Sequence, residues 1–289
     1  MPLPTDDTLV SYASGATEGV GTVLHTEILD DGRAAILLDA TPCHPVDAGW
    51  PDQGPDRATM TWNGSTVDVV DCVVGATDGS LLFLGSEVPV RKGTGGWAFL
   101  VVHLITGPAP AVGQQVTVTV DAEHRRAISL GHTACHLASL ALNRAMADRW
   151  TKELAPDALG SPNFDQAGND SSTIVPHGSV DSYRMNKSLR RKGFTTDGLA
   201  EALPAISDAL NAQLTSWVAS AAPVRIDRDG DGLTDRRYWV CTLPDGVAVI
   251  PCGGTHATSL AELVGLRATL QLIDVDGTPV LTMRTTTTT

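Results

Sequence analysis

The feature that most constrains the fold of this chain is a change of hydrophobic period at Asp121. Between residues 18 and 121, short apolar or alternating runs are separated by turn sequences, which are Asp30-Asp31-Gly32, Asn63-Gly64 and Asp78-Gly79. Such runs are typical of β-strands, and the Asp-Gly and Asn-Gly pairs accept the positive φ angles of tight hairpins. We therefore expect a small β-barrel domain over residues 1–120.

A helical period follows this domain. Apolar residues recur on one face over residues 123–150, which predicts a long helix. A second helix is expected over residues 195–220, with Pro204 kinking or splitting it. Between them, residues 155–180 are rich in Pro, Gly, Asn, Asp and Ser, which predicts a meandering insertion. Strands are expected at about 222–227, 236–242, 247–250, 264–274 and 278–284, and a frayed end at 285–289.

Together these patterns predict an α+β chain of two domains. In the second, residues 121–289, we expect helices packed on a largely antiparallel sheet. No apolar run approaches the roughly 18 residues that span a bilayer, and no basic region followed by an apolar one begins the chain. We therefore expect a cytoplasmic protein with no membrane role. Its 5 cysteines, odd in number and widely spaced, favour reduced thiols over disulfides.

The formal charge of −13 excludes a broad electrostatic surface for nucleic acid and indicates no DNA partner. Any contact with RNA has to be local. The densest basic cluster is the candidate for it, with a solvated loop or strand face as the alternative. This basic cluster consists of Arg184, Lys187, Arg190, Arg191 and Lys192.

The predicted first helix carries the sequence His132-Thr133-Ala134-Cys135-His136. Residues four apart on a helix are neighbours at about 5–6 Å between Cβ atoms, so both imidazoles can reach one ion. Such a pair also occurs as satisfied core or capping histidines. The motif has Thr133 where a metalloprotease has glutamate, which excludes that class of enzyme.

A second pair, Cys252 and His256, frames the sequence Cys252-Gly253-Gly254-Thr255-His256. Two glycines let the backbone wrap closely around an ion, although a glycine turn with a buried cysteine is the alternative. The four side chains His132, His136, Cys252 and His256 form a donor set that suits tetrahedral zinc. We therefore predict one Zn²⁺ per chain.

With both motifs in this order, the chain resembles the free-standing alanyl-tRNA editing proteins and the related editing domains of alanyl- and threonyl-tRNA synthetases. The resemblance spans roughly residues 20–270. It implies a zinc-dependent hydrolase that deacylates mischarged tRNA in trans. The implied substrates are serine or glycine on tRNA(Ala), and serine or a threonine analogue on tRNA(Thr). Thr133 and Thr255 are candidate catalytic residues that hydrogen-bond the substrate, or else they only stabilise their turns.

The departures from the family lie in a stiff loop over residues 41–55. The family carries a segment of the type Gly-Gly-Gly-Gln-Pro-x-Asp-x-Gly, and His44–Gly54 occupies the similar position here. Trp50 then falls where the family has glutamine, so we expect it to contact the substrate in a reshaped aminoacyl pocket. The basic cluster is the expected contact for the tRNA acceptor stem.

The segment between Asp227 and Asp235 resembles a calcium loop of the Asp-x-Asp-x-Asp-Gly type. Its candidate ligands are the carboxylates of Asp227, Asp229, Asp231 and Asp235. Tyr238 stands where such a loop has its bidentate acid. A polar hairpin between strands is therefore the alternative to a Ca²⁺ site.

Two other functions remain open from the sequence. One is a zinc hydrolase of small amino-acid esters or amides that does not act on tRNA. The other is a non-catalytic binding module in which zinc staples the fold. The identity of the amino acid and of the tRNA, and the oligomeric state, are left open.

Overall fold

The computed structural model describes residues 2–288 and divides the chain into two compact units. The first unit holds residues 1–125 together with 226–237 and 253–255. The second holds residues 126–225, 238–252 and 256–289. The first unit therefore includes two short segments from beyond the boundary that we expected at residue 120. The chain is mixed α+β with antiparallel sheets, as predicted.

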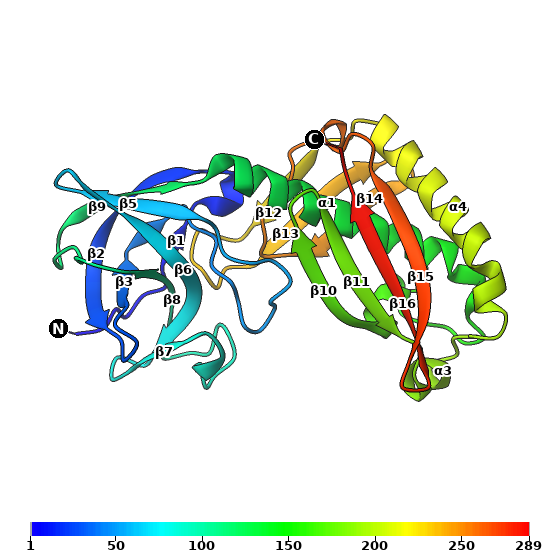
Figure 1. The fold of residues 1–289 in the computed structure, drawn as a ribbon, viewed down its shortest axis with the longest axis horizontal. Helices are drawn as coiled ribbons and strands as arrows, with labels where there is room; N and C mark the ends of the chain where they lie inside the picture. Colours follow the sequence, from blue (N-terminus) through cyan, green and yellow to red (C-terminus); the bar gives the residue numbers. More distant parts are fainter. Residues whose placement is uncertain (1, 289) are drawn as a thin grey trace. The chain divides into compact units, whose positions relative to one another are not determined.

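A seven-stranded antiparallel sheet builds the first unit (Figure 1). Its strand order is β5-β9-β2-β3-β8-β6-β7, and β5 also pairs with β6, so six strands form a continuous circuit of pairings. The strands are β2 (Glu18–Ile28), β3 (Ala34–Leu38), β5 (Ala58–Trp62), β6 (Ser65–Thr77), β7 (Leu82–Leu84), β8 (Ala98–Ile105) and β9 (Gln115–Val120). Two short strands, β1 (Leu9–Val10) and β4 (Ala40–Thr41), pair in parallel beside them.

The interior of this sheet is apolar, because alternate side chains of most strands point to one side. Gln115–Val120 alternates exposed and buried residues, whereas every residue of β8 is buried. The core contains Ile36, Met60 and Phe99, each at most 1% exposed. This unit supplies a rigid frame for the loops that leave it.

A long helix and a four-stranded sheet organise the second unit. The helix is α1 (Ala122–Ala145), which begins at the end of the first unit. The sheet has the order β10-β11-β16-β15, and all of its pairings are antiparallel. Its strands are β10 (Asn169–Val175), β11 (Gly178–Arg184), β15 (Arg267–Val275) and β16 (Thr278–Thr286).

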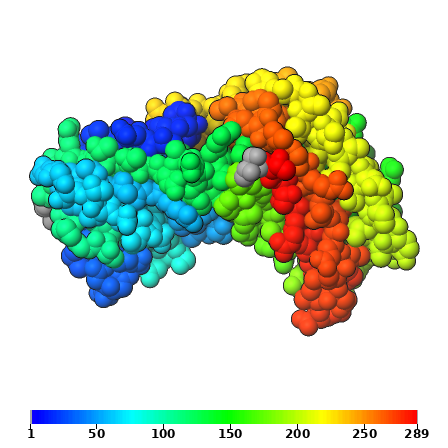
Figure 2. Space-filling view, turned by 45° about the horizontal axis from the view of Figure 1, so that its top comes forward, coloured from blue at the N-terminus to red at the C-terminus, as the bar shows by residue number. Residues whose placement is uncertain are grey.

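The helix α4 (Leu199–Ala219) packs against β15. Figure 2 shows α4 in yellow beside the orange β15 on one face of the molecule. Pro204 lies inside α4 without splitting it. A third sheet has the order β12-β13-β14, with β12 (Val224–Arg228), β13 (Arg237–Leu243) and β14 (Gly246–Pro251).

Two expectations for the second half of the chain were wrong. Part of the region predicted as a meandering insertion is the hairpin of β10 and β11, preceded by α2 (Phe164–Gly168) and followed by α3 (Lys187–Arg191). The segment predicted to fray is ordered through Thr286 as part of β16, and Thr285 is 2% exposed. Both segments are polar. They adopt strand conformation because β11, in the first segment, pairs with β16, which contains the second. Among residues 2–288, no helix is both long and apolar enough to cross a membrane.

Candidate metal centre

The helix α1 presents His132 and His136 on one face, as the four-residue spacing predicts. Their ring centroids lie 4.9 Å apart. His132 is 1% exposed and His136 is partly buried, so this pair faces the interior of the second unit.

Gly131 brings the same turn of α1 against the β10–β11 hairpin. A Cβ atom at residue 131 would lie 2.4 Å from the carbonyl oxygen of Val175 and 2.5 Å from that of Gly178. Only glycine leaves room for this approach. The residue before His132 therefore sets how closely the ligand-bearing turn sits on the hairpin.

The loop after β14 brings the other two predicted ligands to the same place. Cys252 Sγ lies 3.4 Å from His132 Nε2, and His256 Nε2 lies 3.2 Å from Cys252 Sγ. The rings of His132 and His256 are 4.3 Å apart between centroids. The structure thus brings together all four predicted ligands, whose donor atoms lie within 4.8 Å of one another.

These spacings fit one tetrahedral ion. With Zn–N about 2.0 Å and Zn–S about 2.3 Å, ligand atoms on a tetrahedral zinc lie roughly 3.3–3.8 Å apart. The 3.2 Å and 3.4 Å contacts of Cys252 Sγ with the two imidazoles are close to that range. One thiol and three imidazoles are the borderline-soft donors that zinc takes. The group contains no carboxylate that would serve as a general base.

His136 is in the state that a metal ligand requires. Burial lowers its pKa to about 4, so the ring is neutral at pH 7. Its buried Nε2 atom has no hydrogen-bond partner among the described residues. A buried polar atom without a partner is costly, and a metal ion would satisfy it. Trp239, which is fully buried, packs beside this ring at 5.2 Å between centroids.

Thr133 lies next to the ligands but is fully buried. Its Oγ1 atom is 3.3 Å from His256 Nδ1 and accepts a hydrogen bond from the backbone N–H of Ala257 at 3.0 Å. The hydroxyl therefore ties the ligand loop to α1. These contacts orient the His256 ring, with Nε2 directed to Cys252 Sγ.

Gln53 is a functional candidate that the sequence reasoning missed. It is 2% exposed, and its side-chain amide forms two hydrogen bonds with Thr255. Gln53 Nε2 donates to Thr255 Oγ1 at 3.0 Å, and Gln53 Oε1 accepts from the Thr255 backbone N–H at 3.0 Å. Thr255 is the residue before His256, so Gln53 fixes the backbone that leads into a ligand.

Trp50, which we had placed at the glutamine position of the family, is 72% exposed. The buried glutamine of this loop is three residues further on. The sequence signal for Gln53 is a glutamine inside the 41–55 loop, three residues beyond the position that corresponds to the family's glutamine. Contact between Trp50 and a substrate stays a prediction.

The basic cluster lies on the end of β11 and on α3, with all five side chains at the surface. Three of the five are engaged within the second unit. Arg184 pairs with Asp170 at 3.6 Å, while Arg190 and Lys192 donate to the backbone carbonyls of residues 185 and 167. Lys187 and Arg191 remain the cations of this cluster without a side-chain partner among residues 2–288.

The Asp227–Asp235 segment does not gather its carboxylates. Among residues 2–288, the groups whose donor atoms converge are the four ligands above and a cysteine–histidine group in the first unit. Asp231 pairs with Arg228 at 3.1 Å, and Asp235 accepts from the backbone N–H of Gly232 at 2.8 Å. These contacts are those of a polar turn, and the calcium site stays a prediction without support from this geometry.

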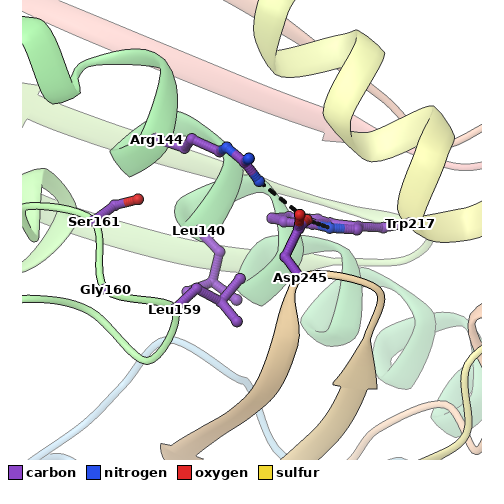
Figure 3. Close-up of a pocket in the computed structure, with 7 residues that line it drawn as sticks. All are labelled: Leu140, Arg144, Leu159, Gly160, Ser161, Trp217 and Asp245. Atoms are coloured by element: carbon purple, nitrogen blue, oxygen red, sulfur yellow. Dashed lines mark hydrogen bonds and ion pairs between the residues drawn. The ribbon is translucent and has the colours of Figure 1, made fainter.

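A separate pocket of about 260 Å³ lies further along α1 (Figure 3). Arg144 at its edge pairs with Asp245 at 3.0 Å, and the same carboxylate accepts from Trp217 Nε1 at 2.7 Å. None of the four metal-ligand candidates lines it. Its two charged side chains, Arg144 and Asp245, pair with each other. The four-residue group around His132 is therefore the stronger candidate for a functional site.

Comparison with known proteins relates the chain to alanine–tRNA ligases. It is 29% identical to the enzyme of Frankia casuarinae over 153 residues, which is 52% of this chain and 14% of that protein. The enzyme of Methanopyrus kandleri is 30% identical over 118 residues, 41% of this chain and 10% of that protein. The chloroplastic/mitochondrial enzyme of Ostreococcus lucimarinus is 24% identical over 241 residues, 83% of this chain and 22% of that protein.

The matched stretch thus spans 14% of the Frankia casuarinae enzyme, a small part of its length. No family model matches the chain.

Proposed function

We propose that this chain is a zinc-dependent hydrolase that removes a wrong amino acid from tRNA in trans. The proposed substrates are serine or glycine on tRNA(Ala), and serine or a threonine analogue on tRNA(Thr). The observation that carries the proposal is the convergence of His132, His136, Cys252 and His256 in one group. The partial likeness to alanine–tRNA ligases supports a tRNA substrate.

The chemistry required is hydrolysis of the ester between an amino acid and the terminal ribose of tRNA. When bound, zinc polarises a carbonyl or lowers the pKa of a water molecule toward neutrality. Zinc in catalytic sites keeps one position open for water or substrate. A four-residue donor set therefore has to release one ligand, expand its shell, or act by positioning the substrate.

Neighbouring residues hold the four predicted metal ligands in position. His132 and His136 come from a helix that Gly131 seats against the β10–β11 hairpin. Thr133 orients the His256 ring, and we assign it a positioning role. Thr255 is 4% exposed and committed to Gln53, so the same role fits its hydroxyl better than contact with substrate. Hydrogen bonds that hold metal ligands in place in this way tune metal affinity in proteins.

The tRNA contact in this proposal is the basic cluster, chiefly Lys187 and Arg191. With a net charge of −13, most of the surface repels a phosphate backbone. A small number of uncompensated cations then decides where the acceptor stem binds. Such a contact predicts a modest, salt-sensitive affinity.

The test is release of labelled amino acid from charged tRNA by the zinc-loaded protein. The substrates are serine- and glycine-charged tRNA(Ala), and tRNA(Thr) carrying serine or a threonine analogue, with correctly charged tRNAs as controls. Faster hydrolysis of at least one mischarged tRNA than of its correct counterpart is expected. No hydrolysis of any of them, with zinc measured in the protein, rejects the proposal.

A second candidate is a zinc hydrolase of small amino-acid esters or amides, which the charge of −13 favours. Binding of uncharged tRNA at low salt separates the two, because phosphate contacts give a steep salt dependence. A third candidate is a binding module stapled by zinc, which a closed set of four ligands favours. In that case His132→Ala unfolds the protein as it removes the metal.

A further inference from the structure

A second group of metal-binding side chains lies inside the first unit, apart from the site described above. Cys43, Cys72 and His103 are each 0% exposed, and one donor atom from each lies within 4.8 Å of the others. Most of their neighbours in this core are aliphatic or aromatic side chains. Two thiols and an imidazole thus meet in a core that is largely apolar.

Strand register places two members of the group face to face. Cys72 on β6 is directly opposite His103 on β8 in the antiparallel pairing. Opposite residues of such a pair have Cβ atoms roughly 4.5–5.5 Å apart and point to the same side of the sheet. The contact between thiol and imidazole is therefore set by the sheet itself.

The third member is held in place by a buried ion pair. The Arg125 guanidinium donates to the Asp56 carboxylate and to the carbonyl oxygen of Pro42, the latter at 2.8 Å. Asp56 also accepts from the His44 backbone N–H at 2.6 Å. The residues on both sides of Cys43 are thus anchored, and its thiol is preorganised beside the other two.

His103 already has the outer contact of a metal-binding imidazole. With Nδ1–H donating to the carbonyl oxygen of Ile36 at 3.3 Å, Nε2 is the acceptor nitrogen of the ring. A histidine ligand ordinarily donates its second ring N–H to a carbonyl in this way. The Thr41 hydroxyl, 2.8 Å from Nε2, is the hydrogen-bond partner that a bound ion would replace.

We propose that Cys43, Cys72 and His103 form a second metal site, for a thiophilic divalent ion of the zinc class. Two thiolates and a neutral imidazole carry a charge of −2, which one divalent ion cancels. A core without water disfavours any net charge, so the neutral complex is preferred.

This site is structural, because its three donors are fully buried and no solvent reaches them. The ion would link the loop after β4 to β6 and β8 across the interior of the sheet. It is independent of the proposed deacylation, since it shares no residue with the group around His132. Metal would enter as the sheet folds.

The experiment measures metal in the full chain after refolding with excess Zn²⁺ and removal of free ion. The unmodified protein is expected to retain about two zinc per chain, and Cys43→Ser/Cys72→Ser about one. The matched control is Cys241→Ser, a fully buried cysteine outside both groups, which should retain about two. One zinc per chain in both the unmodified protein and Cys43→Ser/Cys72→Ser overturns the proposal.

A second measurement covers the case in which Cys43→Ser/Cys72→Ser does not fold. In His132→Ala/Cys252→Ser, which lacks the first group, Co²⁺ should bind at about one per chain with a thiolate-to-cobalt charge-transfer band. Absence of that band overturns the proposal. Alkylation of the denatured, metal-free wild-type chain should find all 5 thiols free; loss of two would indicate a Cys43–Cys72 disulfide and would also overturn it.

Discussion

His132 Nε2 and Cys252 Sγ lie 3.4 Å apart although 120 positions separate the two residues in the chain. The helix α1 supplies one and the loop after β14 supplies the other. A thiol and an imidazole at this distance are either hydrogen-bonded or ready to share an ion. The same thiol lies 3.2 Å from His256 Nε2, which favours the shared ion.

Thr133→Val should weaken zinc binding at this site without unfolding the protein. The substitution removes the hydroxyl that orients His256 and accepts from the Ala257 N–H. Loss of such an outer contact typically lowers metal affinity about 10–100-fold. Competition with a chromogenic chelator measures the change. Thr133→Ser keeps the hydroxyl and should bind zinc like the wild type; equal weakening in both variants would show that the methyl group, not the hydroxyl, matters.

Gln53→Leu should lower the free energy of unfolding by about 1–3 kcal/mol, the cost of leaving a buried donor unsatisfied. The Thr255 N–H loses its acceptor, and no water replaces it because both residues are nearly fully buried. Urea denaturation followed by circular dichroism checks this. Gln271→Leu, at an exposed position of β15, is the matched control and should change stability little. Equal effects would mean that the Gln53–Thr255 bonds contribute nothing specific.

Gly131→Ala should destabilise the chain by about 1–3 kcal/mol, as expected for overpacking. The new Cβ meets backbone oxygens at 2.4 and 2.5 Å, and backbone moves less readily than a side chain. Gly95→Ala is the control, since a Cβ there has no atom within 4 Å and the backbone needs no positive φ. Thermal melting of both variants measures the difference, and a Gly131→Ala protein as stable as the control contradicts the close approach.

Lys187→Ala/Arg191→Ala should weaken binding of uncharged tRNA and reduce the slope of log affinity against log salt by about two. Hydrolysis of a small amino-acid ester should stay unchanged, because neither residue belongs to the metal group. Arg267→Ala/Arg284→Ala removes the same charge from exposed positions of β15 and β16. If both double variants lose affinity equally, net charge and not the basic cluster governs binding.

How far the sequence predicts this structure depends on the range of the contacts involved. The His132–His136 pair was predictable because helical spacing is local, and the ligand set followed from the second motif, Cys252–His256. The change of period at Asp121 located α1 to within a few residues at its start. These signals are carried by neighbouring residues.

The missed features depend on residues far apart in the chain. The strand β10 has few apolar residues, and its partner β11 pairs with β16, where Ser179 N–H donates to Thr285 Oγ1 across 106 positions. Gln53 and Thr255 are 202 positions apart in the chain, and the sequence around each residue contains no pattern that predicts their contact. The Cys72–His103 pair likewise depends on strand register, which a single sequence specifies weakly before the fold is known.

The most direct test of the proposed function is to titrate Zn²⁺ into chelator-treated protein while following hydrolysis of serine-charged tRNA(Ala) and the other mischarged tRNAs. Activity should rise with zinc and saturate in the wild type and in His124→Ala, a control on the same helix. His136→Ala should remain folded by circular dichroism and show at least a 100-fold lower rate at every zinc concentration. Full activity in the chelator-treated protein, or equal activity in His136→Ala and the wild type, would contradict a zinc-dependent deacylase at this site.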